Sequence, residues 1–207
     1  MNISISDALK AKCPNIVLSV IESEVKIEPS SPELLEEINQ ICEQITTNTP
    51  VNQINQIPAI ATSRKAYKAL GKDPSRYRLS AEALMRRIVK GKGLYHINNV
   101  VDLINLTSIQ SGFSIGGYNL DAIEGEVVFD IGGTEPYDAI GRGTLNIENL
   151  PVFKDEKGTF GSPTSDSTRT MITNETTRFL MVIISFDGNE GLEEATNLAH
   201  RLIKTYG

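Results

Sequence analysis

Apolar residues in the first half of this chain recur every three or four positions, the spacing of one face of an α-helix. The clearest example is "SSPELLEEINQICEQI", which starts at residue 30 and offers Ser30 as its N-cap. Gly112 is the expected C-cap of a later helix over residues 98–110, although the apolar residues of that segment also fit a strand. The same spacing predicts four further helices, over residues 59–70, 80–91, 98–110 and 190–206.

The second half changes to short apolar, β-branched runs separated by glycine, proline and asparagine, which is typical of strands and turns. One similar run lies near the start of the chain. The predicted strands are "NIVLSVIESEVKI" at 15–27, "EVVFDI" at 126–131, "LPVFKD" at 150–155 and "TRFLMVIISF" at 177–186. Helices in one half and strands in the other indicate an α+β protein with an antiparallel or mixed sheet. The 207 residues are expected to form a single domain.

Composition narrows the classes of function. No apolar run approaches the ~20 residues that a membrane span needs. The segment "MNISISDALKAKCPN" lacks the features of a signal peptide, so we expect a cytoplasmic protein with no membrane partner. Cys13 and Cys42 are the only cysteines and are expected to be free thiols. His96 and His200 are the only histidines, so neither a zinc site nor a cofactor is expected. The sequence does not exclude a magnesium site made of carboxylates.

One segment is strongly basic. Between residues 64 and 92 there are ten lysines and arginines and two acids, a local charge of +8 in a chain whose formal net charge is −6. Such a segment indicates a confined anion-binding surface rather than general attraction to nucleic acid. A pair of solvated helices with basic outer faces would give the same composition.

The stretch "GFSIG" at residues 112–116 matches the G-x-S-x-G pattern of a hydrolase nucleophile elbow, with Ser114 in the nucleophile's place. An elbow requires a strand before the serine and a helix directly after it. Here a helix is predicted before Ser114, and the only later histidine, His200, lies in the last predicted helix. The match is therefore expected to be accidental, and Ser114 to be a turn residue.

Three other stretches carry a resemblance to a known family: "SAEALMRR" at 80–87, "VVDLIN" at 100–105 and "GSPTSDSTRT" at 161–170. Through these, and in unbroken order over residues 60–185, the chain resembles the B3/4 domain of the phenylalanyl-tRNA synthetase beta subunit in a small stand-alone form. The resemblance implies a three-layer sandwich of sheets and helices. The strand and helix before this core and the last helix are then expected to pack on it.

Within the synthetase, this domain hydrolyses the ester of tRNA mischarged with tyrosine. The resemblance thus implies an aminoacyl-tRNA deacylase that acts in trans on the aminoacylated 3′ end of tRNA, with no DNA partner. An ester is already activated, so an enzyme need only position water, polarise the carbonyl and stabilise the oxyanion. A non-catalytic module that binds tRNA or an amino-acid-like ligand is the main alternative, and a subunit working through protein contacts is another.

The family's pattern G-Q-P-x-H-A-[FY]-D falls on residues 112–119 of this chain. Gly116 then stands where the family has its pocket histidine, Tyr118 stands on the aromatic position, and Asn119 on the aspartate. The loss of an imidazole changes either the reaction or the ligand. It favours the binding-module alternative.

The candidate site residues combine this resemblance with residue chemistry. Asp166 is expected to orient a water or accept a hydrogen bond from a substrate ammonium, with an Asx-turn as the structural alternative. Catalytic roles are expected for Asp166, Ser167 and Thr170. The ligand-pocket candidates are Asp102, Asn105, Gly116, Tyr118 and Ser165, of which Asp102 and Asn105 share a helix face. RNA or phosphate contacts are expected from Arg64, Tyr67, Arg86, Arg87 and Arg169.

Overall fold

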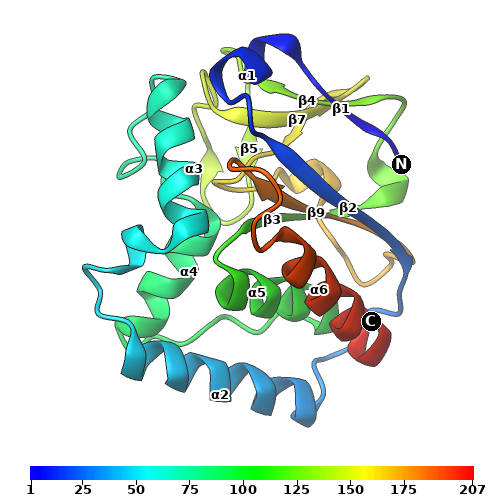
Figure 1. Ribbon diagram of the computed structural model, residues 1–207. Coiled ribbons are helices and arrows are strands. Elements are labelled where there is room, and N and C mark those ends of the chain that lie inside the picture. Colours follow the sequence, from blue (N-terminus) through cyan, green and yellow to red (C-terminus); the bar gives the residue numbers. More distant parts are fainter.

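The computed structural model describes all 207 residues and shows six α-helices with three sheets (Figure 1). The helices are α1 (Asp7–Lys12), α2 (Pro32–Asn48), α3 (Pro58–Ala69), α4 (Ser80–Val89), α5 (Asn99–Ser111) and α6 (Leu192–Tyr206). None of them is both long and apolar enough to cross a membrane. Short 3₁₀ turns are η1 (Ile54–Gln56), η2 (Leu120–Ala122) and η3 (Thr168–Thr170).

The strands form one mixed sheet, one antiparallel sheet and a short antiparallel pair. The mixed sheet has the order β1 (Ile3–Ile5), β4 (Val127–Ile131), β7 (Pro151–Asp155) and β8 (Gly158–Gly161), with β1 parallel to β4. The antiparallel sheet has the order β2 (Val17–Glu24), β9 (Arg178–Ser185) and β3 (Ser114–Asn119). The remaining pair is β5 (Asp138–Ala139) and β6 (Gly143–Thr144). The α+β class is thereby confirmed.

Strand β9 shows why the molecule has three layers. Its near-continuous apolar sequence marks a strand that is buried on both faces. Phe179, Met181 and Ile183 pack into the core against the helices, while the alternate residues Leu180, Val182 and Ile184 pack into a second core against the mixed sheet. Because side chains alternate across a strand, one strand supplies both cores. The antiparallel sheet is therefore the middle layer of the sandwich (Figure 1).

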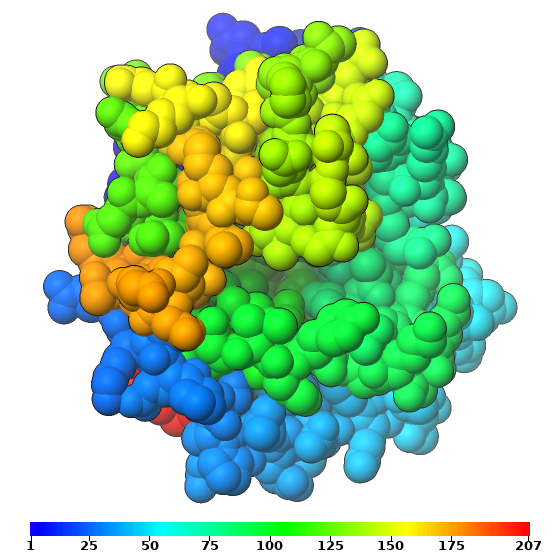
Figure 2. Space-filling view, turned by 180° about the vertical axis from the view of Figure 1, so that it is seen from behind, coloured from blue at the N-terminus to red at the C-terminus, as the bar shows by residue number.

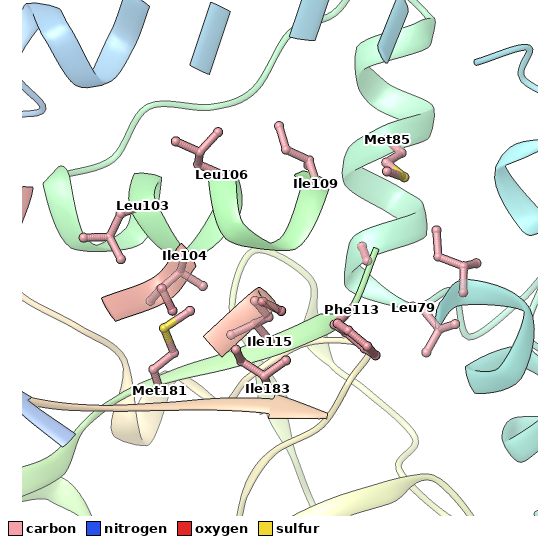
Figure 3. Packing of buried hydrophobic residues seen from close by; sticks show 14 of the residues in the cluster. Leu79, Met85, Leu103, Ile104, Leu106, Ile109, Phe113, Ile115, Met181 and Ile183 are labelled. Carbon is pink, nitrogen blue, oxygen red and sulfur yellow. The ribbon is translucent and has the colours of Figure 1, made fainter. Parts of the chain in front are cut away.

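The helix-side core is built from α4, α5 and the middle sheet. Figure 3 shows Ile104 of α5 pointing toward β3 and β9, while Leu106 and Ile109 point away from the sheet, and Met85 of α4 and Leu79 close one end. The labelled residues of this packing are Leu79, Met85, Leu103, Ile104, Leu106, Ile109, Phe113, Ile115, Met181 and Ile183. Helix α2 covers α4 and α5 from outside, and α3 and α4 flank the layers at one side (Figure 1).

The predicted helices are confirmed, with one change of cap. Ser31, not Ser30, caps α2, because its Oγ accepts a hydrogen bond from the Leu34 N–H at 3.3 Å. Gly112 ends α5 at φ +79°, a conformation in which glycine avoids a steric penalty. Cys13 and Cys42 are free thiols, as predicted. The strand predictions missed β1, β3, β5, β6 and β8, and no helix was predicted over α1.

Candidate functional site

Asp166 lies in a turn of residues 162–166, between β8 and η3, that organises its own backbone. Ser162 Oγ accepts from the N–H groups of Thr164 and Ser165, at 3.3 and 3.1 Å, and donates to the Ser165 carbonyl at 2.9 Å. The Ile140 N–H donates to the Asp166 carbonyl at 2.9 Å, which ties the turn to the segment of β5 and β6. Serine side chains that bond nearby backbone groups are a common way to fix such a turn.

Three buried tyrosine hydroxyls hold this turn from three different parts of the chain. Each tyrosine is at most 2% exposed. The pairs are Tyr118 of β3 with Asp166 Oδ1 at 2.9 Å, Tyr137 with the Ser165 carbonyl at 2.7 Å, and Tyr67 of α3 with Thr164 Oγ1 at 2.9 Å. A buried tyrosine hydroxyl needs a hydrogen-bond partner. The packing of these rings and the position of the turn are therefore coupled.

The Tyr118 hydroxyl occupies space that two glycines leave open. A Cβ atom at Gly116 or at Gly161 would overlap this hydroxyl and the adjoining ring carbons. The space beside Gly116 is therefore filled by the Tyr118 side chain, whose hydroxyl reaches Asp166. Gly116 lies against the Tyr118 side chain rather than against an open space. The glycine that the sequence aligns with a pocket histidine therefore leaves no empty space at this position.

Burial sets the protonation of the Asp166 carboxyl. Desolvation raises its pKa to about 7, although the Tyr118 hydroxyl and the Gly117 N–H, at 3.4 Å from Oδ2, stabilise the carboxylate. Burial also raises the pKa of Tyr118 well above its ordinary value, with the Asp166 charge adding to it, so this hydroxyl keeps its proton and donates. A carboxyl that titrates near neutral pH is suited to proton transfer.

A hollow lies on the face that carries this turn (Figure 2). We define the hollow by the segments that border it: residues 90–105, residues 138–146 and residues 163–173. Four of the six exposed large apolar side chains belong to these segments, namely Tyr95, Ile97, Ile140 and Met171. Asp166 is partly exposed within the last of them, and Gly117 beside it faces Ile104 and Ile172. The hollow thus combines an apolar border with one carboxyl of raised pKa, the usual make-up of a ligand site.

The other candidates from the ligand pocket and catalytic set have structural partners. Asp102 is 1% exposed, and its carboxylate accepts hydrogen bonds from Ser30 Oγ at 2.6 Å and from the Ile97 N–H at 3.1 Å. Ser167 Oγ caps η3, and Thr170 Oγ1 lies 3.5 Å from the Phe160 carbonyl in the core. Ser165 Oγ lies 3.4 Å from the Ile140 carbonyl. Asn105 is partly exposed on α5, next to Ile104, and stays a prediction.

Most of the arginines chosen for phosphate contacts form ion pairs with acids. Arg64 and Arg86 each lie 2.8 Å from the carboxylate of Glu82, which is buried, and Arg169 forms a two-pronged pair with Asp155 at 2.8 and 3.1 Å. Tyr67 is fully buried, so no base can stack on its ring. Tyr67 is therefore corrected to a structural role, while Arg64, Arg86 and Arg169 are held in ion pairs and their phosphate contacts stay a prediction. The sequence could not show that Glu82 is the acid on which the arginines converge.

Two site features escaped the sequence interpretation. The sequence indicates no role for Tyr137, and it indicates Gly161 only as part of a family motif. Neither position has a local signal, because each matters through a ring or a turn that comes from elsewhere in the chain. No group of three or more His, Cys, Asp or Glu side chains is placed to hold a metal ion.

We expect that Ser114 can be replaced without loss of stability. It starts β3, is 2% exposed, and its Oγ has no hydrogen-bond partner. Ser114→Ala should leave the free energy of unfolding unchanged or raise it, because no satisfied hydrogen bond is lost. The matched control is Ser108→Ala, which removes a buried hydroxyl that donates to the Phe113 carbonyl at 2.7 Å. This control should cost about 1 kcal/mol. Urea denaturation of both variants measures the difference, and a larger loss for Ser114→Ala would contradict this assignment.

Comparison with known proteins places the chain in a family. The B3/4 domain family matches residues 62–206, and the chain belongs to this family. Among solved structures, the chain is similar to an N-terminal fragment of the phenylalanyl-tRNA synthetase beta subunit from Pyrococcus horikoshii, with 14% identity and a TM-score of 0.49. That match covers all of this chain and 50% of the fragment, so the chain spans half the fragment's length. No curated protein matches the sequence.

Proposed function

We propose that this B3/4 domain protein hydrolyses the ester bond of mischarged aminoacyl-tRNA in trans, with Asp166 as the general base. The observation that carries the proposal is the Asp166 carboxyl, whose pKa burial raises to about 7, in a segment that borders the hollow. Membership of the B3/4 family, together with the resemblance of the sequence to the synthetase domain, suggests the substrate class. The structure of the site supplies the chemistry.

In the proposed reaction, water attacks the carbonyl carbon of the ester while Asp166 accepts one of its protons. The bond from that carbon to the ribose oxygen breaks, and the oxygen leaves with a proton. The products are the free amino acid and tRNA with a free 3′ hydroxyl. Asp166 can act only when ionised, and Tyr118 positions it by donating to Oδ1 at 2.9 Å. No protein nucleophile is needed, which agrees with the buried Ser114.

Asp166→Asn is expected to lower kcat/KM for deacylation by at least about 100-fold, the usual contribution of a general base. The test incubates the protein with tRNA charged with tyrosine, alanine or serine and follows release of the amino acid above the spontaneous rate. Asp187→Asn is the matched control, because Asp187 is exposed on a different loop. In the wild type, kcat/KM should rise with pH and level off above about 7, as the carboxyl of Asp166 ionises.

Two further measurements separate catalysis from a structural role. Tyr118→Phe should move the midpoint of the pH profile upward, because the lost hydroxyl stabilises the carboxylate.

The folded protein also keeps a proton on Asp166 up to about pH 7, whereas an unfolded aspartate ionises near 4. The free energy of unfolding should therefore fall as pH rises from about 4 to about 7, and Asp166→Asn should flatten this slope. Wild-type protein that hydrolyses none of these esters contradicts the proposed function.

One observation favours a second candidate, a module that binds the same aminoacylated end without turnover. The space beside Gly116 is filled by Tyr118, so no imidazole stands beside Asp166. In a binding module, Asp166 would instead accept a hydrogen bond from the ligand's ammonium. Retained affinity for charged tRNA together with no hydrolysis supports this candidate, and any Asp166-dependent release of amino acid excludes it.

A further inference from the structure

Several cations next to the Asp166 turn have no acidic partner. Lys68, Lys72 and Arg76 follow one another through the end of α3 and the turn after it, and none of them forms an ion pair. Lys72 Nζ lies 4.1 Å from the centre of the Tyr77 ring, and the Arg76 guanidinium lies 5.5 Å from it. One aromatic ring therefore holds two of these charges together at the surface.

This basic turn adjoins the Asp166 turn directly. The residue before Lys68 is Tyr67, whose hydroxyl bonds Thr164, and Thr164 Oγ1 also lies 3.5 Å from the Tyr77 carbonyl. Arg142, from the segment of β5 and β6, extends the positive charge toward the hollow. Arg142 is exposed and forms no ion pair. It lies close enough to Tyr67 for its charge to lower the pKa of that hydroxyl, against the rise that burial causes.

An aromatic platform stands on another side of the hollow. Tyr95 is 65% exposed and belongs to the segment that borders the hollow below in Figure 2. The Arg87 guanidinium covers the Tyr95 ring at 3.7 Å from its centre, and Arg87 is itself held by the Lys92 carbonyl at 3.1 Å. A tyrosine ring backed by a guanidinium and still largely open to solvent is suited to stacking on a nucleobase.

We propose that these two features form the docking surface for a single-stranded RNA 3′ end, with Lys68, Lys72, Arg76 and Arg142 binding phosphates and Tyr95 stacking a base. Partnerless cations that adjoin a stacking ring fit RNA, because an acidic peptide offers charge but no base to stack. This inference rests on the proposed function only for the identity of the RNA. Docking and ester hydrolysis are separate properties of the chain.

The experiment measures binding of uncharged tRNA, which carries no ester, over a range of salt concentrations. A second probe is the same tRNA without its single-stranded 3′ extension. Tyr95→Ala should weaken binding of the intact tRNA about tenfold and leave binding of the shortened tRNA unchanged. Tyr95→Phe, which keeps the ring, should bind like the wild type. Lys68→Ala/Arg76→Ala should weaken binding of the intact tRNA and lower its slope of log K against log salt by about 1.5, with little effect on the shortened tRNA.

The control for charge is Lys157→Ala/Lys204→Ala, which removes two exposed lysines far from the basic turn in sequence. Equal urea midpoints for all variants show that the fold is intact. RNA affinity that is the same in Lys68→Ala/Arg76→Ala and in its control overturns the phosphate surface, and equal loss on both probes for Tyr95→Ala overturns the stacking platform. Variant-sensitive RNA binding by a protein that hydrolyses no ester supports the docking surface while contradicting the deacylase.

Discussion

Glu82→Gln is expected to lower the free energy of unfolding by about 3 kcal/mol, because it removes the only acid from a cluster of arginines. Glu82 is 1% exposed, and its two oxygens lie 2.8 Å from Arg64 and 2.8 Å from Arg86. A third guanidinium, that of Arg78, lies 3.9 Å away. Glutamine keeps the size of the side chain but turns an N–H₂ donor toward one of the guanidinium groups, so charge and hydrogen bonding are lost together.

Glu43→Gln provides the matched control for this loss, because Glu43 is exposed on α2 and forms no ion pair. Urea denaturation at pH 7 gives both values. A difference below about 1 kcal/mol between the two variants would place the Glu82 cluster among ordinary surface ion pairs. It would also return Arg64 and Arg86 to the set of cations available to RNA.

Gly161→Ala is expected to lower the free energy of unfolding by about 2 kcal/mol, the cost of forcing extra volume into a packed core. The new methyl group would overlap the Tyr118 hydroxyl, which has Gly116 on its other side. The Tyr118 ring cannot swing away freely, because it packs edge-on against Phe160 at 4.9 Å between ring centres. The expected result is therefore a strained ring and a displaced Asp166, detected as loss of stability and as a changed pH profile.

A double-mutant cycle identifies the cause of that loss. In Gly161→Ala/Tyr118→Phe the overlap is reduced, so the two changes together should cost less than their sum by about 1 kcal/mol. Gly158→Ala does not serve as a control because its φ of +119° disfavours any side chain. Gly133→Ala is suitable, since its new methyl would meet only the end of the Glu135 side chain. Strict additivity of the Gly161 and Tyr118 changes would contradict the proposed overlap.

Local signals in the sequence were enough for the helices but not for every strand. Capping residues and a spacing of three or four predicted α2 to α6 because those signals lie within each helix. Strand β3, "SIGGYN", carries two glycines and is a strand only because β9 pairs with it from 60 to 70 residues away, from Asn119 with Phe179 at the near end of the ladder to Ser114 with Ile184 at the far end. Strand β1 has three residues and depends on β4 in the same way.

The same limit applies to the site. The serines around Asp166 indicated a polar turn, and the structure shows such a turn at residues 162–166. Its pKa depends on Tyr118 and on burial, neither of which can be derived from neighbouring letters. The basic segment was visible as charge, but the sequence did not show which cations Glu82 neutralises. The partnerless cations therefore had to come from the structure.

Strand β9 also determines the order in which this chain can fold during synthesis. Its two partners, β2 and β3, are completed by residues 24 and 119, yet neither can form its ladder until residues 178–185 have left the ribosome. Until then both apolar cores lack their common strand and stay open to solvent. Such late closure makes nascent chains slow to fold and dependent on chaperones. Cells that make this protein quickly should therefore hold it in a chaperone-bound form before the middle sheet closes.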